Sequence, residues 1–340
     1  MSRARVQLQI LSRREVVAGL AAGGALVACD DTRFGVSKDT QPDTGVENLE
    51  SIPAITPNED FYVTSCCGTP EIDGAAWSCL VRDGETELAS FDLAWLEAQT
   101  PRDKEHTLEC IGAGPYNLAI SNAVWSGLPL SEIFEALGVS APADAIEIVF
   151  TSEDGYSTSL PVSDLDLPVW LVWQMNGVSL PAKHGYPVRL LVPGRYGMKN
   201  PKWIVEIAFS TEAYTGFWES YGWSQTAEYK TNALIDQPAR RATVEASAVR
   251  VQGMAFAGSD PIALVQVSVD GGDWQDATLD YNPGADIWTL WHLDIELEPG
   301  EHTIQARCVT ASGAASLDDP EGSDGLNGYD GGMAVEVEAV

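Results

Sequence analysis

The sequence predicts a mixed α+β region followed by an all-β region with the strand spacing of a β-sandwich. From about residue 52 to residue 235, apolar strand-like runs are combined with one clear helical repeat. From residue 236 onward, short alternating runs are separated by Gly and Asp turns, with almost no helical periodicity. A chain of 340 residues with 45% hydrophobic residues is long enough to build two sizeable cores.

In the first region, the clearest single element is a short amphipathic helix. Leu130, Ile133, Phe134 and Leu137 are spaced i, i+3, i+4 and i+7, and Gly138 follows where such a helix would end. Apolar runs predict strands elsewhere in the region, at residues 61–63, 77–81, 146–150, 188–192 and 203–209. The helix and these runs together give the mixed α+β assignment.

In the second region, strands follow one another at short intervals. Val265, Val267 and Val269 alternate with polar residues, and the turn at 270–272 follows them. Further runs lie at residues 287–293, 302–309 and 333–337, and the alternation places Cys308 on the inward face. This spacing is typical of a β-sandwich.

The N-terminal segment has the features of an export signal. The pair Arg13 and Arg14 precedes an apolar stretch of small residues at 18–28, which is too short to span a bilayer comfortably. The pair resembles a twin-arginine signal, and residues 26–29 resemble a lipobox with Cys29 as the lipidated residue; an ordinary cleaved signal is the alternative. We expect a signal peptide at 1–28, a tether at 29–50, and an exported, membrane-anchored lipoprotein in the periplasm or on the cell surface.

Charge and cysteine content narrow the possible partners. A net charge of −31 makes nucleic acid an improbable partner, because phosphate binding needs a basic surface. The acidic surface could steer a basic partner, or could reflect a salty habitat. Cys66 and Cys67 are adjacent, so a vicinal disulfide is possible, but pairing among Cys66, Cys67, Cys79 and Cys308 cannot be read from sequence.

The most informative residue is Cys110, which ends a short apolar strand and precedes a turn at Gly112. Thiolate is a suitable donor for a soft, redox-active metal, although most lone cysteines are simply buried. His184, Arg189 and Lys202 follow further along the chain, with Asn200 and the turn at 197–201 between the last two. A planar guanidinium, an ammonium and backbone amides suit a phosphate group.

These motifs resemble the sulfite oxidase family of molybdenum enzymes. The Trp125-to-Leu130 segment follows Cys110 at the family's distance, and residues 176–189 match the family's Asn-Gly-Xaa-Xaa-Leu-Pro-Xaa-Xaa-His-Gly-Xaa-Pro-Xaa-Arg almost position by position. Segments 250–253, 269–274 and 328–333 resemble its dimerisation domain. The resemblance implies a molybdopterin domain of mixed α+β fold at 51–235 and an immunoglobulin-like β-sandwich at 236–340.

The resemblance also implies a set of site residues. Molybdenum would be ligated by Cys110, and molybdopterin would be held by residues that the family's motifs place around it: Thr64, Ser65, Cys66, Cys110, Ser152, His184, Arg189, Asn200, Pro201 and Lys202.

The sequence departs from the family around the substrate. Thr64 stands where sulfite oxidases have a substrate-binding arginine, and Trp173 stands where they have a tyrosine beside the metal. A further arginine shortly after the metal cysteine is absent. Cys110, Trp173 and Tyr116 are therefore the expected catalytic residues, with Asn117 and Arg195 shaping a less cationic pocket than sulfite would favour.

The resulting functional prediction is oxygen-atom transfer on a small substrate at a Cys110-ligated molybdenum. No haem motif is evident, so electrons would pass to or from a separate protein such as a cytochrome. A homodimer is implied by the second domain. The alternative is a catalytically silent scaffold that binds the cofactor or has lost it.

Overall fold

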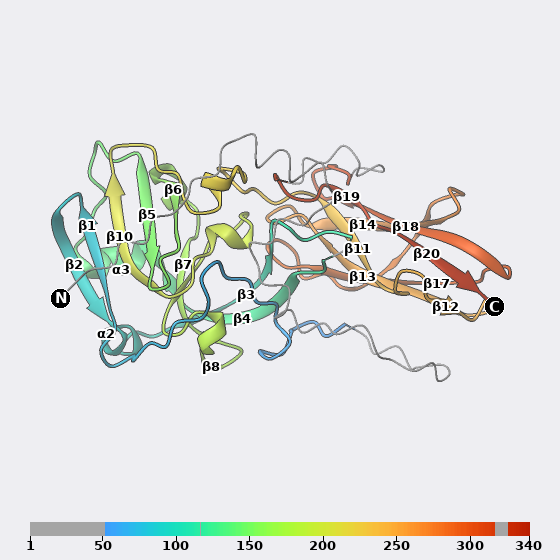
Figure 1. Ribbon diagram of the computed structural model, residues 1–340, viewed down its shortest axis with the longest axis horizontal. Coiled ribbons are helices and arrows are strands. Elements are labelled where there is room, and N and C mark those ends of the chain that lie inside the picture. Colours follow the sequence, from blue (N-terminus) through green and yellow to red (C-terminus); the bar gives the residue numbers. More distant parts are fainter. Residues whose placement is uncertain (1–51, 116, 317–325) are drawn as a thin grey trace, which may run out of the picture. The chain divides into compact units, whose positions relative to one another are not determined.

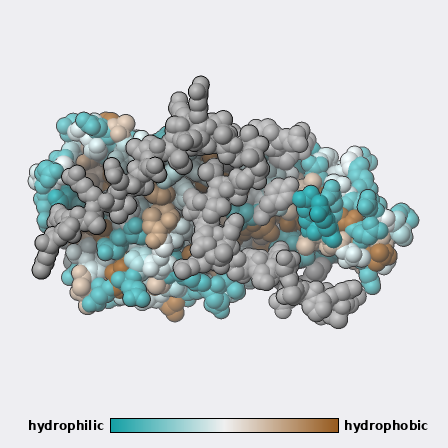
Figure 2. Space-filling model, viewed as in Figure 1, coloured by the Kyte–Doolittle hydropathy of each residue, from teal (hydrophilic) through white to brown (hydrophobic). Residues whose placement is uncertain are grey.

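The computed structural model describes residues 52–115, 117–316 and 326–340. The predicted signal peptide, the tether with Cys29, and Tyr116 lie outside these residues. Within the described ranges, no helix is both long and apolar enough to span a bilayer. On the face shown in Figure 2, hydrophilic residues cover much of the described surface, with hydrophobic residues scattered among them.

One five-stranded sheet of the first region has the order β2-β1-β10-β5-β6 (Figure 1). Its strands are β1 (Ser78–Asp83), β2 (Thr86–Asp92), β5 (Glu147–Ser152), β6 (Ser157–Pro161) and β10 (Ile204–Ser210). β1 and β10 pair in parallel, and the other neighbours are antiparallel. The strands predicted at 77–81, 146–150 and 203–209 are thus confirmed to within a few residues.

The second sheet of this region has the order β3-β4-β7-β8, and β9 also pairs with β7. Its strands are β3 (Arg102–Glu109), β4 (Ile120–Pro129), β7 (Trp170–Met175), β8 (Val178–Ser179) and β9 (Arg189–Leu191). The β3–β4 pair leaves Cys110 directly after β3, and β9 begins at Arg189. Two of the predicted site residues therefore stand at strand ends.

Helices are few and short in the described residues. They are α2 (Leu93–Glu97), α3 (Leu130–Leu137) and the 3₁₀ turns η1 (Val162–Asp166), η2 (Ala182–His184), η3 (Gly197–Lys199) and η4 (Glu219–Tyr221). α3 buries Leu130, Ile133 and Phe134, and Gly138 ends it in the left-handed conformation (φ 68°), as the periodicity predicted. The fold is mostly β-sheet, and α+β describes it only roughly.

The strand predicted at 61–63 is wrong, because this segment makes no strand pairing. Phe61 is nevertheless 3% exposed, and its ring contacts Trp125 and His184 edge-on at 5.5 and 5.4 Å between centroids. Side-chain packing explains the apolar residues here, so apolar character did not require a strand.

The second region contains two further five-stranded sheets. The first has the order β16-β17-β13-β11-β19, from β11 (Asn232–Gln237), β13 (Val249–Phe256), β16 (Thr278–Tyr281), β17 (Thr289–Ile295) and β19 (Gly331–Gly332). The other has the order β12-β20-β18-β14-β15, from β12 (Thr243–Val244), β14 (Ile262–Val269), β15 (Gln275–Asp276), β18 (Gly300–Thr310) and β20 (Ala334–Ala339). Both sheets contribute to one hydrophobic core, where Cys308 is 0% exposed as predicted.

Hydrogen bonds join this second region to β3 and so help to hold the segment before Cys110. The Thr107 amide donates to the Asp286 carbonyl at 2.9 Å, and the Trp288 amide donates to the Thr107 hydroxyl at 2.9 Å. The Asn232 side-chain amide donates to both carboxylate oxygens of Glu109, at 3.0 and 3.2 Å. The residue before Cys110 is thus anchored by a strand of the other region.

Candidate functional site

Cys110 occupies the first position of the turn that follows β3. Its amide donates to the Ala119 carbonyl at 2.9 Å, and its carbonyl accepts from the Ala113 amide at 2.8 Å. The side chain is half-buried and takes part in no disulfide. A Cβ at Gly112 would lie 3.9 Å from the Cys110 Sγ and 3.8 Å from the Trp223 ring, so both side chains lie close to Gly112.

Three tyrosines that the sequence argument missed lie near Cys110. A Cβ at Gly197 would lie 2.8 Å from the Tyr62 hydroxyl and 4.0 Å from the Cys110 Cα, so this turn lies beside Cys110 and leaves no room for a side chain next to Tyr62. Burial is the main cause that raises the pKa of Tyr62, Tyr156 and Tyr196, and Cys110 adds to each shift. The phenols remain protonated and can donate hydrogen bonds.

His184, Arg189 and Lys202 form a cluster of basic side chains, which is called the cationic cluster below. η2 ends at His184, β9 begins at Arg189, and Arg189 and Lys202 form an isolated β-bridge. A Cβ at Gly185 would lie 3.0 Å from that of Arg189 and 3.2 Å from that of Lys202, and its φ is 115°. Glycine at this position therefore allows Arg189 and Lys202 to pack closely against this turn.

The cationic cluster is buried at an electrostatic cost. Burial lowers the pKa of Arg189 to about 10, that of Lys202 to about 7 and that of His184 to about 4, and Arg189 lowers the last two further. In the part of the chain that the structure describes, none of the three forms an ion pair with a carboxylate. Uncompensated buried charge is unfavourable, so the cluster is suited to an anion from outside the chain.

The polar atoms of this cluster also point to an external acceptor. Arg189 donates from its two terminal nitrogens to the carbonyls of His184 and Asn200, at 3.1 and 3.2 Å, but its buried Nε has no partner. The buried Ser152 hydroxyl likewise has none. Buried polar groups are normally hydrogen-bonded, and a phosphate-bearing pterin would satisfy these donors. The donor set therefore fits the phosphate of molybdopterin, and ligation of molybdenum by the Cys110 thiolate stays a prediction.

Other predicted cofactor residues have structural roles in this fold. The Asn200 side chain accepts from the Val192 amide at 2.6 Å and donates to the carbonyls of Arg195 and Tyr196, at 3.0 and 2.9 Å. The Pro201 carbonyl accepts from the Leu190 amide at 3.0 Å. Both residues shape the turn that carries Lys202, and direct cofactor contact by either stays a prediction.

The predicted substrate-side residues are less clearly assembled. Trp173 is 3% exposed and belongs to the hydrophobic core of the first region, so packing alone accounts for it. Arg195 is ion-paired with Asp164 at 2.8 Å and Glu228 at 2.7 Å, which explains it as a structural residue. Thr64 and Ser65 are half-buried outside helices and strands. Catalytic or cofactor roles for Trp173, Thr64 and Ser65 stay predictions.

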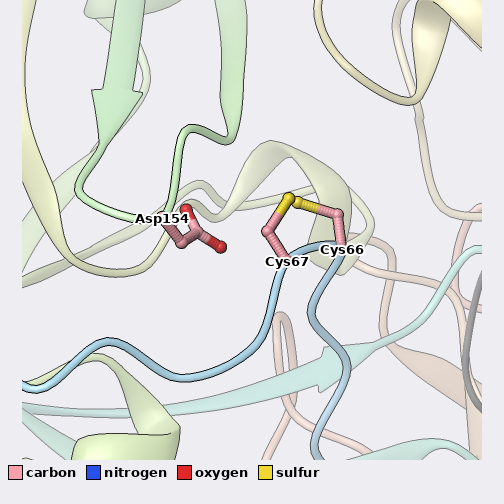
Figure 3. A group of neighbouring side chains, drawn as sticks. All are labelled: Cys66, Cys67 and Asp154. Atoms are coloured by element: carbon pink, nitrogen blue, oxygen red, sulfur yellow. The ribbon is translucent and has the colours of Figure 1, made fainter. Parts of the chain in front are cut away.

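A carboxylate and a disulfide lie at the edge of this site. Cys66 and Cys67 are disulfide-bonded, and the Cys67 Sγ lies within 4.8 Å of an Asp154 carboxylate oxygen (Figure 3). Asp154 follows β5, where its Oδ1 accepts from the Tyr156 amide at 3.0 Å. Burial raises the pKa of Asp154, and Lys202 partly offsets this shift. Asp154 is therefore close to the disulfide and interacts electrostatically with Lys202 of the cationic cluster.

Comparison with known proteins agrees with this geometry. The family model described as "Oxidoreductase molybdopterin binding domain" matches residues 67–218, and "Mo-co oxidoreductase dimerisation domain" matches residues 224–319. Sulfite oxidase of Gallus gallus is 29% identical over 308 residues, which cover 76% of this chain and 67% of that protein. Mitochondrial sulfite oxidase of Homo sapiens is 30% identical over 301 residues, covering 75% of this chain and 55% of the human protein.

A solved structure extends the likeness to the fold. The crystal structure of the sulfane dehydrogenase SoxCD from Paracoccus pantotrophus has a TM-score of 0.73, covering 90% of this chain and 95% of that one at 21% identity. Fold, site and comparisons thus define a molybdopterin-dependent oxidoreductase. The chain belongs to the sulfite oxidase family, and its cofactor is Mo-molybdopterin.

Proposed function

We propose that this protein catalyses oxygen-atom transfer on a small substrate at a molybdenum ion ligated by Cys110. The observation that carries the proposal is the buried cationic cluster, which forms no ion pair with a carboxylate in the described residues, together with Tyr62, which interacts electrostatically with both Arg189 and Cys110. A silent scaffold would have no use for buried, unsatisfied charge, because such charge destabilises the fold. We therefore do not favour that alternative.

Within this proposal the chain's residues bind, orient and donate protons. The bound metal would supply the two-electron redox change, with Cys110 thiolate as its donor from the protein. Arg189, Lys202 and His184 would hold the pterin phosphate, and the Ser152 hydroxyl would take up a further polar contact. Tyr62 interacts electrostatically with both Cys110 and Arg189. Its hydroxyl would donate a hydrogen bond at the reacting centre.

We infer a substrate of low charge. In the described residues, the phenols of Tyr62, Tyr156 and Tyr196 interact electrostatically with Cys110, and none of them carries a positive charge. Nearby basic residues are engaged elsewhere: Arg195 by Asp164 and Glu228, and Lys199 by Glu219. A dianion would therefore lack the charge-assisted contacts that are worth about 1.5–3 kcal/mol each.

The direct test is steady-state kinetics on the cofactor-loaded protein with sulfite, dialkyl sulfoxides and N-oxides. We expect kcat/KM to be higher for an S-oxide or N-oxide than for sulfite. If sulfite gave saturable cytochrome reduction with a higher kcat/KM than any S-oxide or N-oxide, the inference that the substrate has low charge would be contradicted. Absence of turnover with every compound, at full molybdenum loading, would favour the scaffold instead.

We also propose that electrons pass to or from a separate redox protein and that the second region supports a homodimer. The net charge of −31 favours a basic electron partner by electrostatic steering. Sedimentation of the purified protein tests the dimer, and salt dependence of cytochrome reduction tests the steering.

The domain division and location are proposals as well. β11 pairs with β13, so we draw the boundary before Asn232 instead of at 235/236, within the strand. We propose an immunoglobulin-like arrangement for the two sheets that follow, and export as a lipoprotein anchored through Cys29. Loss of fatty-acid labelling and of membrane association in Cys29→Ala would support the anchor, and unchanged labelling would contradict it.

A further inference from the structure

The adjacent cysteines Cys66 and Cys67 form a disulfide on an accessible part of the chain. Cys67 is exposed and Cys66 is half-buried. Among the described residues, Cys79, Cys110 and Cys308 are not disulfide-bonded, and Cys79 and Cys308 are buried. An exposed disulfide can be attacked by a thiolate from solution, whereas the buried thiols are shielded.

This disulfide is linked to the candidate site in two ways. Along the chain, Cys67 follows Tyr62 after four residues, and Tyr62 is one of the phenols near Cys110. In space, the Cys67 sulfur lies within 4.8 Å of the Asp154 carboxylate (Figure 3), and Asp154 interacts electrostatically with Lys202 of the cationic cluster. The disulfide is therefore connected along the chain to Tyr62 and lies near a carboxylate that interacts with Lys202.

We propose that the Cys66–Cys67 disulfide is a thiol–disulfide exchange site whose reduction by an external dithiol alters the cofactor site. A thiolate of the dithiol attacks the exposed Cys67 sulfur, the bond between Cys66 and Cys67 breaks, and the Cys66 thiolate takes a proton from water. The second thiol of the reductant then attacks the mixed disulfide and releases the Cys67 thiolate, which is protonated in turn. The protein gains two electrons and two protons, and the dithiol becomes a disulfide.

Asp154 sets the rate of this exchange. Its negative charge repels the approaching thiolate and the thiolate that leaves, because both are close to the carboxylate. At this distance and in a largely aqueous setting, the repulsion corresponds to a rate difference of about fivefold. Asp154→Asn should therefore be reduced about fivefold faster than the wild type at low salt, and the difference should shrink at high salt.

The first experiment counts thiols and does not depend on any substrate. The folded holoenzyme is incubated with dithiothreitol, alkylated under native conditions and mapped by peptide mass. We expect alkylation at Cys66 and Cys67 after reduction only, with Asp154→Asn faster and the exposed-loop control Asp144→Asn unchanged. Unreacted Cys66 and Cys67 in the folded protein, when denatured protein is reduced normally, would overturn the proposal.

The second experiment measures the effect on the site and rests on the proposed function only for its activity readout. Dithiothreitol should lower the turnover and the molybdopterin retention of the wild type, and re-oxidation should restore both. The C66S/C67S variant should no longer respond to the reductant. Reduction of the disulfide with no change in cofactor retention or turnover would overturn the coupling, while a protein inactive in every state would still report through its cofactor content.

Discussion

Replacement of Arg189 by methionine separates the cofactor role of this residue from a role in folding. One pKa unit corresponds to about 1.4 kcal/mol, so the lowering to about 10 by burial represents a penalty of about 3 kcal/mol, which methionine removes. Against this gain, the carbonyls of His184 and Asn200 each lose a charge-assisted hydrogen bond worth about 1.5–3 kcal/mol. The contact with the Trp125 ring, 5.0 Å from the guanidinium carbon, is worth about 1 kcal/mol more. The unfolding free energy of the apoprotein should therefore fall by about 1–4 kcal/mol.

Cofactor binding should respond much more strongly to the same change. A guanidinium has five N–H donors, and Arg189 uses two of them on backbone carbonyls, so three remain for an anion. Two charge-assisted hydrogen bonds to phosphate are worth about 3–6 kcal/mol together, which corresponds to affinity about 10²- to 10⁴-fold weaker in Arg189→Met.

Denaturant unfolding of the apoprotein and molybdenum content after gel filtration measure these two effects. Arg195→Met is the matched control, because Arg195 is ion-paired with Asp164 and Glu228. It should lose about 1–3 kcal/mol of stability and keep the cofactor. A strongly destabilised Arg189→Met that still retains molybdenum would refute the reasoning.

Three further predictions concern buried charge in the apoprotein. Burial lowers the pKa of Lys202 from 10.5 to about 7, so between these pH values the unfolded chain binds a proton that the folded chain has lost. The free energy of unfolding should therefore rise with pH across this window. Urea titrations should show a smaller rise for Lys202→Met. Glu109 acts in the opposite sense, because burial raises its pKa from 4.5 to about 8. Its contribution to the free energy of unfolding is fully present below pH 4.5 and is lost as the pH rises toward 8. Glu109→Gln should abolish this fall of the free energy of unfolding with pH. Lys199→Met should cost about 3–5 kcal/mol, because it leaves the Glu219 carboxylate charged and buried, and adding Glu219→Gln should recover much of the loss; equal stability of the single and double variants would contradict this pairing.

Sequence patterns predicted those elements whose signal is local. α3 has a complete helical repeat and a glycine at its end, and β5 and β10 are apolar runs of ordinary strand length. The segment 61–63 has the same apolar character but packs against Trp125 and His184 without pairing. Whether an apolar run becomes a strand depends on partners that are distant in sequence, and no local pattern contains that information.

The candidate site shows the same division. Cys110 and the cationic cluster could be named as candidates because their motifs resemble those of the family, whereas Tyr62, Tyr156 and Tyr196 come from separate parts of the chain and interact with Cys110 only in the fold. A tyrosine in an apolar run is indistinguishable by sequence from an ordinary core residue. The pairing of Asp154 with the disulfide was invisible for the same reason.

X-ray absorption at the molybdenum edge tests the central claim most directly. The wild-type holoenzyme is compared with Cys110→Ser, after cofactor content has been matched. Because Cys110 is the proposed protein ligand, the variant should show one sulfur neighbour fewer around molybdenum and one more oxygen or nitrogen neighbour. An identical sulfur shell in both proteins would contradict the assignment of Cys110 as the metal ligand.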